Sequence, residues 1–179
     1  MRTTDDGVQT QFLTCQIADE EYGIGIMEVR EILQYETMTR VPNVPPFVRG
    51  VINLRGSVVP VVDLALKFGQ PARQTHRRTC IIIVETASRG GSVFGILADS
   101  VSEVIELHPG QIKPPPDFGT RAQEGHLRGM GSIGNRFVLL LAPDRILGED
   151  DPITDPSGTP EPGRGLRADG PPRGSSAAA

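Results

Sequence analysis

Tryptophan is absent from this 179-residue sequence, and aromatic residues make up only 4% of it. The net charge is −4, so an excess of lysine and arginine is missing as well. Proteins that bind nucleic acids usually present a basic surface and aromatic side chains on which bases stack. The composition therefore argues against a nucleic-acid partner.

Long apolar runs are also missing. The longest one, residues 137–142, is far shorter than the ~20 residues that a helix needs to cross a bilayer. The N-terminal residues include no apolar segment behind a basic start, so we expect no secretory signal. We therefore expect a cytoplasmic protein that does not insert into the membrane.

Residues that often carry chemistry occur without the spacing that chemistry requires. The two cysteines, Cys15 and Cys80, can form a disulfide or remain free, and the lack of a cysteine framework favours buried free thiols. The three histidines show no metal-ligand spacing. Because a phosphate-binding loop and a nucleophile elbow are also missing, we expect no enzyme activity, no metal and no cofactor.

Composition divides the chain into a folded part and two loose ends. From residue 150 onward, proline and glycine are frequent and large apolar residues are few. Such a segment cannot bury enough surface to offset its ordering entropy. We expect a flexible N-terminus over residues 1–9, one folded domain over 10–149 and a disordered tail over 150–179.

The folded part is predicted to be all-β. Short apolar or alternating runs separated by turn residues are typical of strands. The predicted strands are residues 13–17, 22–26, 51–54, 58–62, 79–85, 93–97, 127–133 and 136–141. They form two groups of about five short strands, without helical crossovers for a parallel sheet, which favours two small barrels.

Two segments carry a helical signal. Val29, Ile32 and Leu33 follow the i, i+3, i+4 spacing of an amphipathic helix, which predicts a short helix over residues 29–33. Residues 100–107 fit either a short helix or a bent strand.

Proline and capping residues add further expectations. Asp63 is expected to cap a helix over residues 64–68. A last short helix is expected over residues 143–147, and Gly148 is expected to end it. Pro60 cannot donate a ladder hydrogen bond, so its strand is expected at a sheet edge or with a bulge there.

Two charged residues stand out. Glu31 lies at the end of the helix predicted over residues 29–33, and Arg55 lies in a tight turn between two apolar strands. An arginine in such a turn is either exposed to solvent or held by a carboxylate. The residues alone leave both alternatives open.

Several ordered motifs resemble the CheW-type chemotaxis coupling proteins. In the first half they are EYGIGIMEVREI at 21–32, VPNVPPFVRG at 41–50, GVINLRG at 50–56 and VPVVDL at 59–64. In the second half they are GILADSV at 95–101, IKPPP at 112–116 and GMG at 129–131. The resemblance covers residues 11–147. Gly25 and Ala142 depart from it, because many members of the family have an acidic residue at those places.

The resemblance implies two SH3-like barrels packed around a shared core, with no catalytic activity and no cofactor. It also implies an adaptor that couples transmembrane chemoreceptors, the methyl-accepting chemotaxis proteins, to the histidine kinase CheA. The helical-hairpin tip of the receptor would dock in an apolar groove between the barrels. The regulatory domain of CheA would be the second partner, and protein contacts would hold the adaptor at membrane receptor arrays.

The motifs also carry over candidate contact residues. The positions matched to the groove or to partner contacts are Ile26, Val29, Ile32, Cys80, Gly95 and Val104. A plain core role stays open for Ile26, Ile32 and Cys80, whereas Val29 is expected to be partly exposed. Gly50 and Gly95 can instead permit close backbone approach.

The resemblance further implies a salt bridge between Glu31 and Arg55 near the groove. We favour a structural role for this pair over direct contact with a partner. A buried charge that loses its partner costs about 3–5 kcal/mol, so we expect the loss of either residue to disturb the groove.

The sequence leaves two alternative functions open. One is a CheW-like coupling or regulatory module of a non-motility chemosensory pathway. The other is a small hydrolase or ligand-binding barrel, which would need a deep polar pocket.

Overall fold

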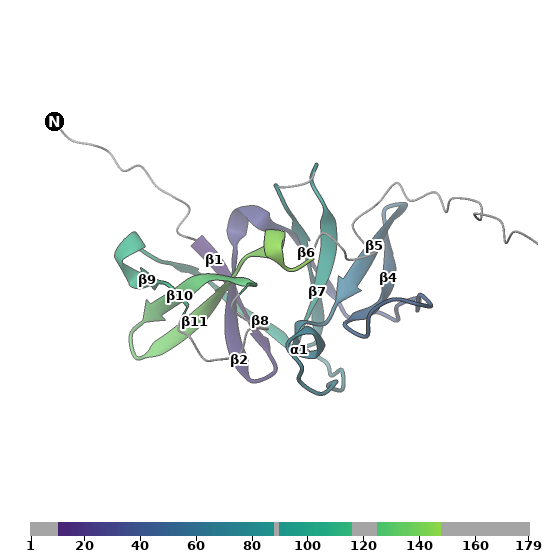
Figure 1. Ribbon diagram of the computed structural model, residues 1–179, viewed down its shortest axis with the longest axis horizontal. Coiled ribbons are helices and arrows are strands. Elements are labelled where there is room, and N and C mark those ends of the chain that lie inside the picture. The colour runs from purple at the N-terminus through teal and green to yellow at the C-terminus, as the bar shows by residue number, and fades with distance from the viewer. Residues whose placement is uncertain (1–10, 88–89, 116–124, 148–179) are drawn as a thin grey trace, which may run out of the picture.

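The computed structural model describes residues 11–87, 90–115 and 125–147, which form two β-sheets (Figure 1). The first sheet contains, in spatial order, β8 (Ser100–Glu106), β1 (Gln11–Ile17), β2 (Glu20–Gly25), β11 (Arg136–Leu141), β10 (Leu127–Ile133) and β9 (Ile112–Lys113). The second contains β3 (Val29–Gln34), β6 (Cys80–Glu85), β7 (Val93–Ala98), β5 (Ser57–Val62) and β4 (Val48–Leu54). The predicted all-β class with two small barrels is confirmed, and β9 adds a sixth, two-residue strand to the first barrel.

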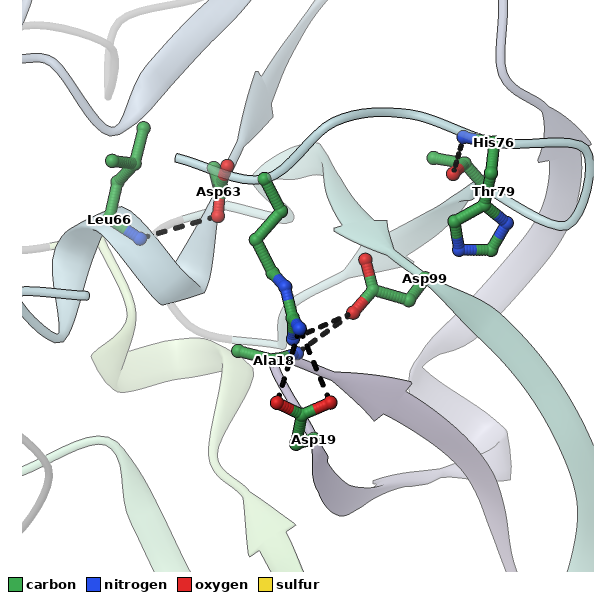
Figure 2. Close-up of polar contacts among 8 residues, drawn as sticks. Ala18, Asp19, Asp63, Leu66, His76, Thr79 and Asp99 are labelled. Carbon is green, nitrogen blue, oxygen red and sulfur yellow. Dashed lines mark hydrogen bonds and ion pairs between the residues drawn. The ribbon is translucent and has the colours of Figure 1, made fainter. Parts of the chain in front are cut away.

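Helices are few and short in the described residues. They comprise the α-helix α1 (Leu64–Lys67) and the 3-10 helices η1 (Ile26–Glu28), η2 (Pro109–Gln111) and η3 (Pro143–Arg145). The predicted cap of α1 is confirmed, because the backbone N–H of Leu66 donates to Asp63 Oδ1 at 3.3 Å (Figure 2). The last predicted helix is a 3-10 turn, and its expected end at Gly148 lies outside the described residues.

The chain passes between the two barrels at two points. The 3-10 helix η1 connects β2 of the first barrel to β3 of the second, and Asp99 connects β7 of the second to β8 of the first. In consequence β1 and β2 share a sheet with β8 and β11, far along the chain. The barrel to which a strand belongs therefore does not follow from its order in the sequence.

Polar contacts surround the second of these crossovers. Asp99 Oδ2 accepts a hydrogen bond from the backbone N–H of Ala18 at 2.9 Å (Figure 2). The guanidinium of Arg73, from the segment between α1 and β6, lies 3.5 Å from Asp99 Oδ2 and 3.1 Å from Asp19 Oδ2. These contacts join the β1–β2 turn to the connection between the barrels.

The largest buried cluster lies between the two sheets. It combines Leu13 and Ile24 from the first sheet with Ile82 and Ile96 from the second. Burying one such side chain contributes about 1.5–3 kcal/mol, so this shared core is a main reason why the barrels stay together.

Two smaller clusters fill the barrel interiors. One contains Val61, Ile81 and Ile83, and the other contains Phe12 and Leu140. Neighbouring residues of β6 thus point alternately into a barrel and into the shared core. Because both faces of this strand are buried, its sequence is continuously apolar rather than alternating.

The helix predicted over residues 29–33 is wrong. These residues lie in β3, which pairs with β6 through Val29 opposite Val84 and Ile32 opposite Ile82. The register shifts between Val29 and Glu31, so one extra residue is accommodated there. This bulge places Val29 and Ile32 on the same face although they are three positions apart, which imitates helical spacing.

The remaining local expectations have mixed outcomes. Residues 100–107 form a strand, β8, so the bent-strand alternative is the right one. The expectation that Pro60 lies on an edge strand or at a bulge is wrong, because β5 lies between β4 and β7 and Pro60 pairs with Val51 in regular register. The pairing of β5 with β7 comprises Val61 and Val62, so it begins after Pro60 and needs no N–H from it. Both cysteines are free and buried.

Candidate binding surface

Three predicted contact residues lie around the first crossover between the barrels. Ile26 and Val29 are partly buried and pack against the shared core from either end of η1. Ile32 lies on β3 and is 45% exposed. Between them, Met27 is 82% exposed, although sequence reasoning did not single it out. This group of apolar side chains, Ile26, Met27, Val29 and Ile32, is called the crossover surface below.

Two other predicted contact residues do not reach the surface. Cys80 belongs to the shared core, and burial, followed by the charge of Asp99, raises the pKa of its thiol. A Cβ on Gly95 would lie only 2.6 Å from Ile81 Cγ2, inside the second barrel. The structure gives both residues packing roles, and their contact with a partner stays a prediction.

Gly50 occupies a position that only glycine fits. Its φ is +155°, and a Cβ there would lie 2.6 Å from the backbone oxygen of Thr39. The close approach joins the segment before β4 to β4 itself, through hydrogen bonds between Thr39 and Val51. The glycine therefore has a structural reason that requires no partner.

The structure brings Glu31 and Arg55 together. Arg55 Nη2 lies 3.4 Å from Glu31 Oε2, with the arginine side chain 79% and the glutamate side chain 25% exposed. Exposed ion pairs contribute only about 0.2–1 kcal/mol. The expected cost of about 3–5 kcal/mol for an unpaired buried charge does not apply, because Arg55 reaches solvent.

A surface cavity of about 280 Å³ adjoins this ion pair. Its walls come from β3, β5 and β7 and include Arg30, Val58 and Val93. No histidine or cysteine is among the residues that line it.

The two barrels repeat one arrangement around a glycine. Gly23 of β2 pairs with Leu140 of the parallel strand β11, and Gly95 of β7 pairs with Val61 of the parallel strand β5. At both glycines an added Cβ would meet side chains of the barrel interior. The strands of the two barrels can therefore be matched residue by residue.

This match makes Ile32 and Val104 equivalent. Ile32 pairs with Ile82 across β3 and β6, and Val104 pairs with Leu13 across β8 and β1. Ile82 and Leu13 both belong to the shared core, and directly paired residues point to the same face of a sheet. Because β3 and β8 are edge strands, Ile32 and Val104 lie where the shared core meets solvent.

The same match relates two outward-facing apolar residues. Val58 lies three residues before Val61, and Phe137 lies three residues before Leu140. Val58 is 71% exposed and Phe137 is 57% exposed, while Val104 is 51% exposed. Sequence reasoning missed Val58 and Phe137, although each occupies an outward position of a strand where a polar residue is the norm.

Glu31 and Glu103 occupy equivalent positions in the two barrels, and each lies near an arginine. Arg136 Nη2 donates to Glu103 Oε1 at 2.7 Å, and its Nε lies 3.7 Å from Glu21. The hydrogen bond with Glu103 and the charge of Glu21 raise the pKa of Arg136. The backbone N–H of Glu103 donates to Thr14 Oγ1, and the Thr14 hydroxyl donates to the carbonyl oxygen of Glu103. Glu103 therefore lies opposite Thr14, as Glu31 lies opposite Ile83 in the other barrel.

Neither a metal centre nor a membrane span emerges from the described part of the chain. No group of three or more His, Cys, Asp or Glu residues there is arranged to hold a metal ion. No helix there has the length and apolar character needed to cross a bilayer.

Comparison with known proteins identifies the family to which this fold belongs. The CheW-like domain family matches residues 11–151. The chain belongs to this family. Its relatives include the chemotaxis protein CheW of Klebsiella aerogenes, 38% identical over 144 residues that cover 80% of this chain and 85% of that protein. CheW of Helicobacter pylori is 36% identical over 141 residues, covering 78% of this chain and 82% of that protein.

A solved structure agrees with the sequence relatives. The scaffolding protein TtCheW from Thermoanaerobacter tengcongensis superposes with a TM-score of 0.67 and 30% sequence identity, covering 75% of this chain and 89% of that one. The two barrels are thus SH3-like, as in that CheW structure. The chain is a chemotaxis coupling adaptor, and the predicted resemblance to the CheW-type proteins is confirmed.

The two departures from the CheW-like pattern lie in different local surroundings. At Gly25, an added Cβ would lie 2.8 Å from Glu28 Oε2, so the glutamate fills the space beside the glycine. At Ala142, the match between barrels gives Asp63 as the equivalent residue. Asp63 caps α1, whereas Ala142 precedes η3 without a side-chain cap.

Proposed function

We propose that this adaptor couples chemoreceptors, the methyl-accepting chemotaxis proteins, to the histidine kinase CheA. It would act as a non-catalytic scaffold that binds the helical-hairpin tip of the receptor and the regulatory domain of the kinase. Such contacts would hold it on the cytoplasmic side of the membrane, at receptor arrays.

The observation that carries this proposal is the placement of Ile32 and Val104. Both are exposed apolar side chains at the borders of the core between the barrels. An apolar ridge of a helical hairpin can pack against such side chains, as helices do when they dock in grooves. The crossover surface adds Met27, whose flexible thioether adapts to irregular partner surfaces.

Charge near these apolar residues supports the same proposal. Glu31 directly precedes Ile32 on β3 and pairs with Arg55, and Glu103 directly precedes Val104 on β8 and pairs with Arg136. Because successive residues of a strand point to opposite faces, each edge strand offers an apolar side chain on one face and an ion pair on the other. Such polar groups can fix the orientation of a partner and exclude incorrect partners. The two equivalent sites would allow one adaptor to hold two different partners.

Binding titrations test the proposal. The chain is titrated with a receptor cytoplasmic fragment and, separately, with CheA. Wild type is expected to bind both, and Ile32→Asp or Val104→Asp is expected to weaken at least one of the two interactions by about tenfold or more. Val41→Asp is the matched control, because Val41 is 36% exposed and lines a different cavity, beside Val44 and Pro45 in the segment before β4.

Two results would overturn the proposal. In the first, wild type binds neither partner. In the second, the Ile32 and Val104 variants bind both partners as tightly as the Val41 variant does.

A further inference from the structure

The crossover between β2 and β3 is short and is anchored by its side chains. The 3-10 helix η1 has three residues, and no side chain caps its N-terminal end at Gly25. Ile26 and Val29 pack against the shared core on either side, while Met27 points outward between them. Packing therefore fixes the two ends of the crossover, and its middle depends on Glu28.

Glu28 makes an ion pair that reaches back to the first barrel. Arg128 Nη2, on β10, donates to Glu28 Oε1 at 2.6 Å. The glutamate side chain is only 19% exposed and the arginine side chain 37%. Hydrogen bonds between ionised groups in such partly buried positions are stronger than neutral ones.

Gly25 leaves the space that this pair needs. A Cβ on Gly25 would lie 2.8 Å from Glu28 Oε2 and 3.8 Å from Arg128 Nη1. Within the described residues, Glu28 Oε2 is buried and has no hydrogen-bond partner, so the arginine is the charge that balances this carboxylate. The three residues thus form one unit at the crossover.

We propose that Arg128 is a positioning residue of the adaptor, which fixes η1 through Glu28 and so sets where Met27 and β3 meet the receptor. This inference rests on the proposed coupling function. Because η1 leads directly into β3, a shift of Glu28 also displaces Val29 and the strand that carries Glu31 and Ile32. Arg128 acts through Glu28 and not by its own contact with the receptor.

Charge exchange at this pair tests the inference. Receptor-fragment affinity is measured for wild type, Arg128→Glu, Glu28→Gln and the double exchange Glu28→Arg with Arg128→Glu. We expect both single variants to bind about tenfold more weakly and the double exchange to recover most of the lost affinity. Hydrogen exchange is expected to quicken over residues 26–31 in the single variants and to slow again in the double exchange.

The control is Arg73→Gln. Arg73 lies between α1 and β6 and contacts Asp19 in the β1–β2 turn, at the end of that hairpin opposite to η1. Arg73 also contacts two carboxylates, but it lies at the crossover formed by Asp99. We expect its receptor affinity to equal that of wild type. If Arg128→Glu fails to fold, Glu28→Gln carries the test alone, because it removes the charge with little change in shape.

The outcomes separate this inference from the coupling function. No binding by wild type would refute the coupling function itself. Wild-type binding together with unchanged affinity in Glu28→Gln would refute the positioning role. A double exchange that stays as weak as Arg128→Glu would show that Arg128 contacts the receptor directly, which also contradicts the inference.

Discussion

Gly95→Ala separates a packing role from a contact role at a position that the family motif marks for partner contact. The new Cβ would lie 2.6 Å from Ile81 Cγ2, 3.2 Å from Val61 Cγ2 and 3.4 Å from Ile83 Cδ1. The nearest atom belongs to a β-branched side chain with a restricted χ1, so it cannot swing away. Overpacking of this kind costs about 1–3 kcal/mol.

Thermal unfolding measures this cost directly. For a chain of this size, 1 kcal/mol lowers the Tm by about 2–4 °C, so Gly95→Ala is expected to lower it by about 2–12 °C. The matched control is Gly110→Ala, because a Cβ on Gly110 meets no atom within 4 Å. The control is expected to change the free energy of unfolding by less than about 0.5 kcal/mol.

Binding completes the test. At a temperature where the Gly95→Ala variant is folded, its affinities for receptor and kinase should equal those of wild type, because Gly95 does not reach the surface. An unchanged Tm would refute the packing argument. A stable variant with lost affinity would show that Gly95 contacts a partner.

Three further predictions address the ion pair, the C-terminal residues and a buried thiol. Arg55→Glu faces Glu31 with a like charge and is expected to weaken receptor binding more than Val29→Ala does, with little change in Tm because Arg55 is exposed; equal binding by the Arg55 variant and wild type would contradict the pairing. Deletion of residues 151–179 is expected to leave binding of both partners intact in pull-downs, and loss of either would contradict this. Burial raises the pKa of Cys15 from 9.0 to about 12, so the stability that its neutral form contributes is full below pH 9 and is lost as the pH rises toward 12. Denaturant melts of wild type and Cys15→Ala at pH 7 to 11 check this, and parallel pH dependences in the two proteins would contradict it.

The strands of this fold could be predicted from the sequence because apolar residues occupy the buried strand positions. The run from Ile81 to Val84 is continuously apolar, and both faces of β6 are indeed buried. The cap at Asp63 follows from local chemistry as well, and β10 and β11 match the strands predicted over residues 127–133 and 136–141. In these cases a local pattern determines a local structure.

Pairing between strands that lie far apart in the sequence was harder to predict. The bulge between Val29 and Glu31 gives β3 the apolar spacing of a helix, and it arises only through pairing with β6. The relation between Ile32 and Val104 likewise depends on two ladders whose partners lie far along the chain. A pattern in one segment cannot specify such partners.

The candidate site was predictable to a similar degree. The motifs drew attention to Ile32, Glu31 and Arg55, and the structure places these residues on one barrel around an exposed ion pair. Exposure, however, depends on the packing of the whole molecule. The sequence therefore did not single out Met27, whereas the burial of Cys80 was expected from the lack of a cysteine framework and is confirmed.

Kinase activation in the reconstituted ternary mixture tests the central claim most directly. CheA activity is measured with receptor fragments assembled on vesicles, with and without this chain. The coupling function predicts that activity rises when the wild-type chain is added, and that Ile32→Asp reduces this rise while Val41→Asp does not. Kinase activity that is the same with and without the wild-type chain, at concentrations where both partners bind it, would contradict the claim.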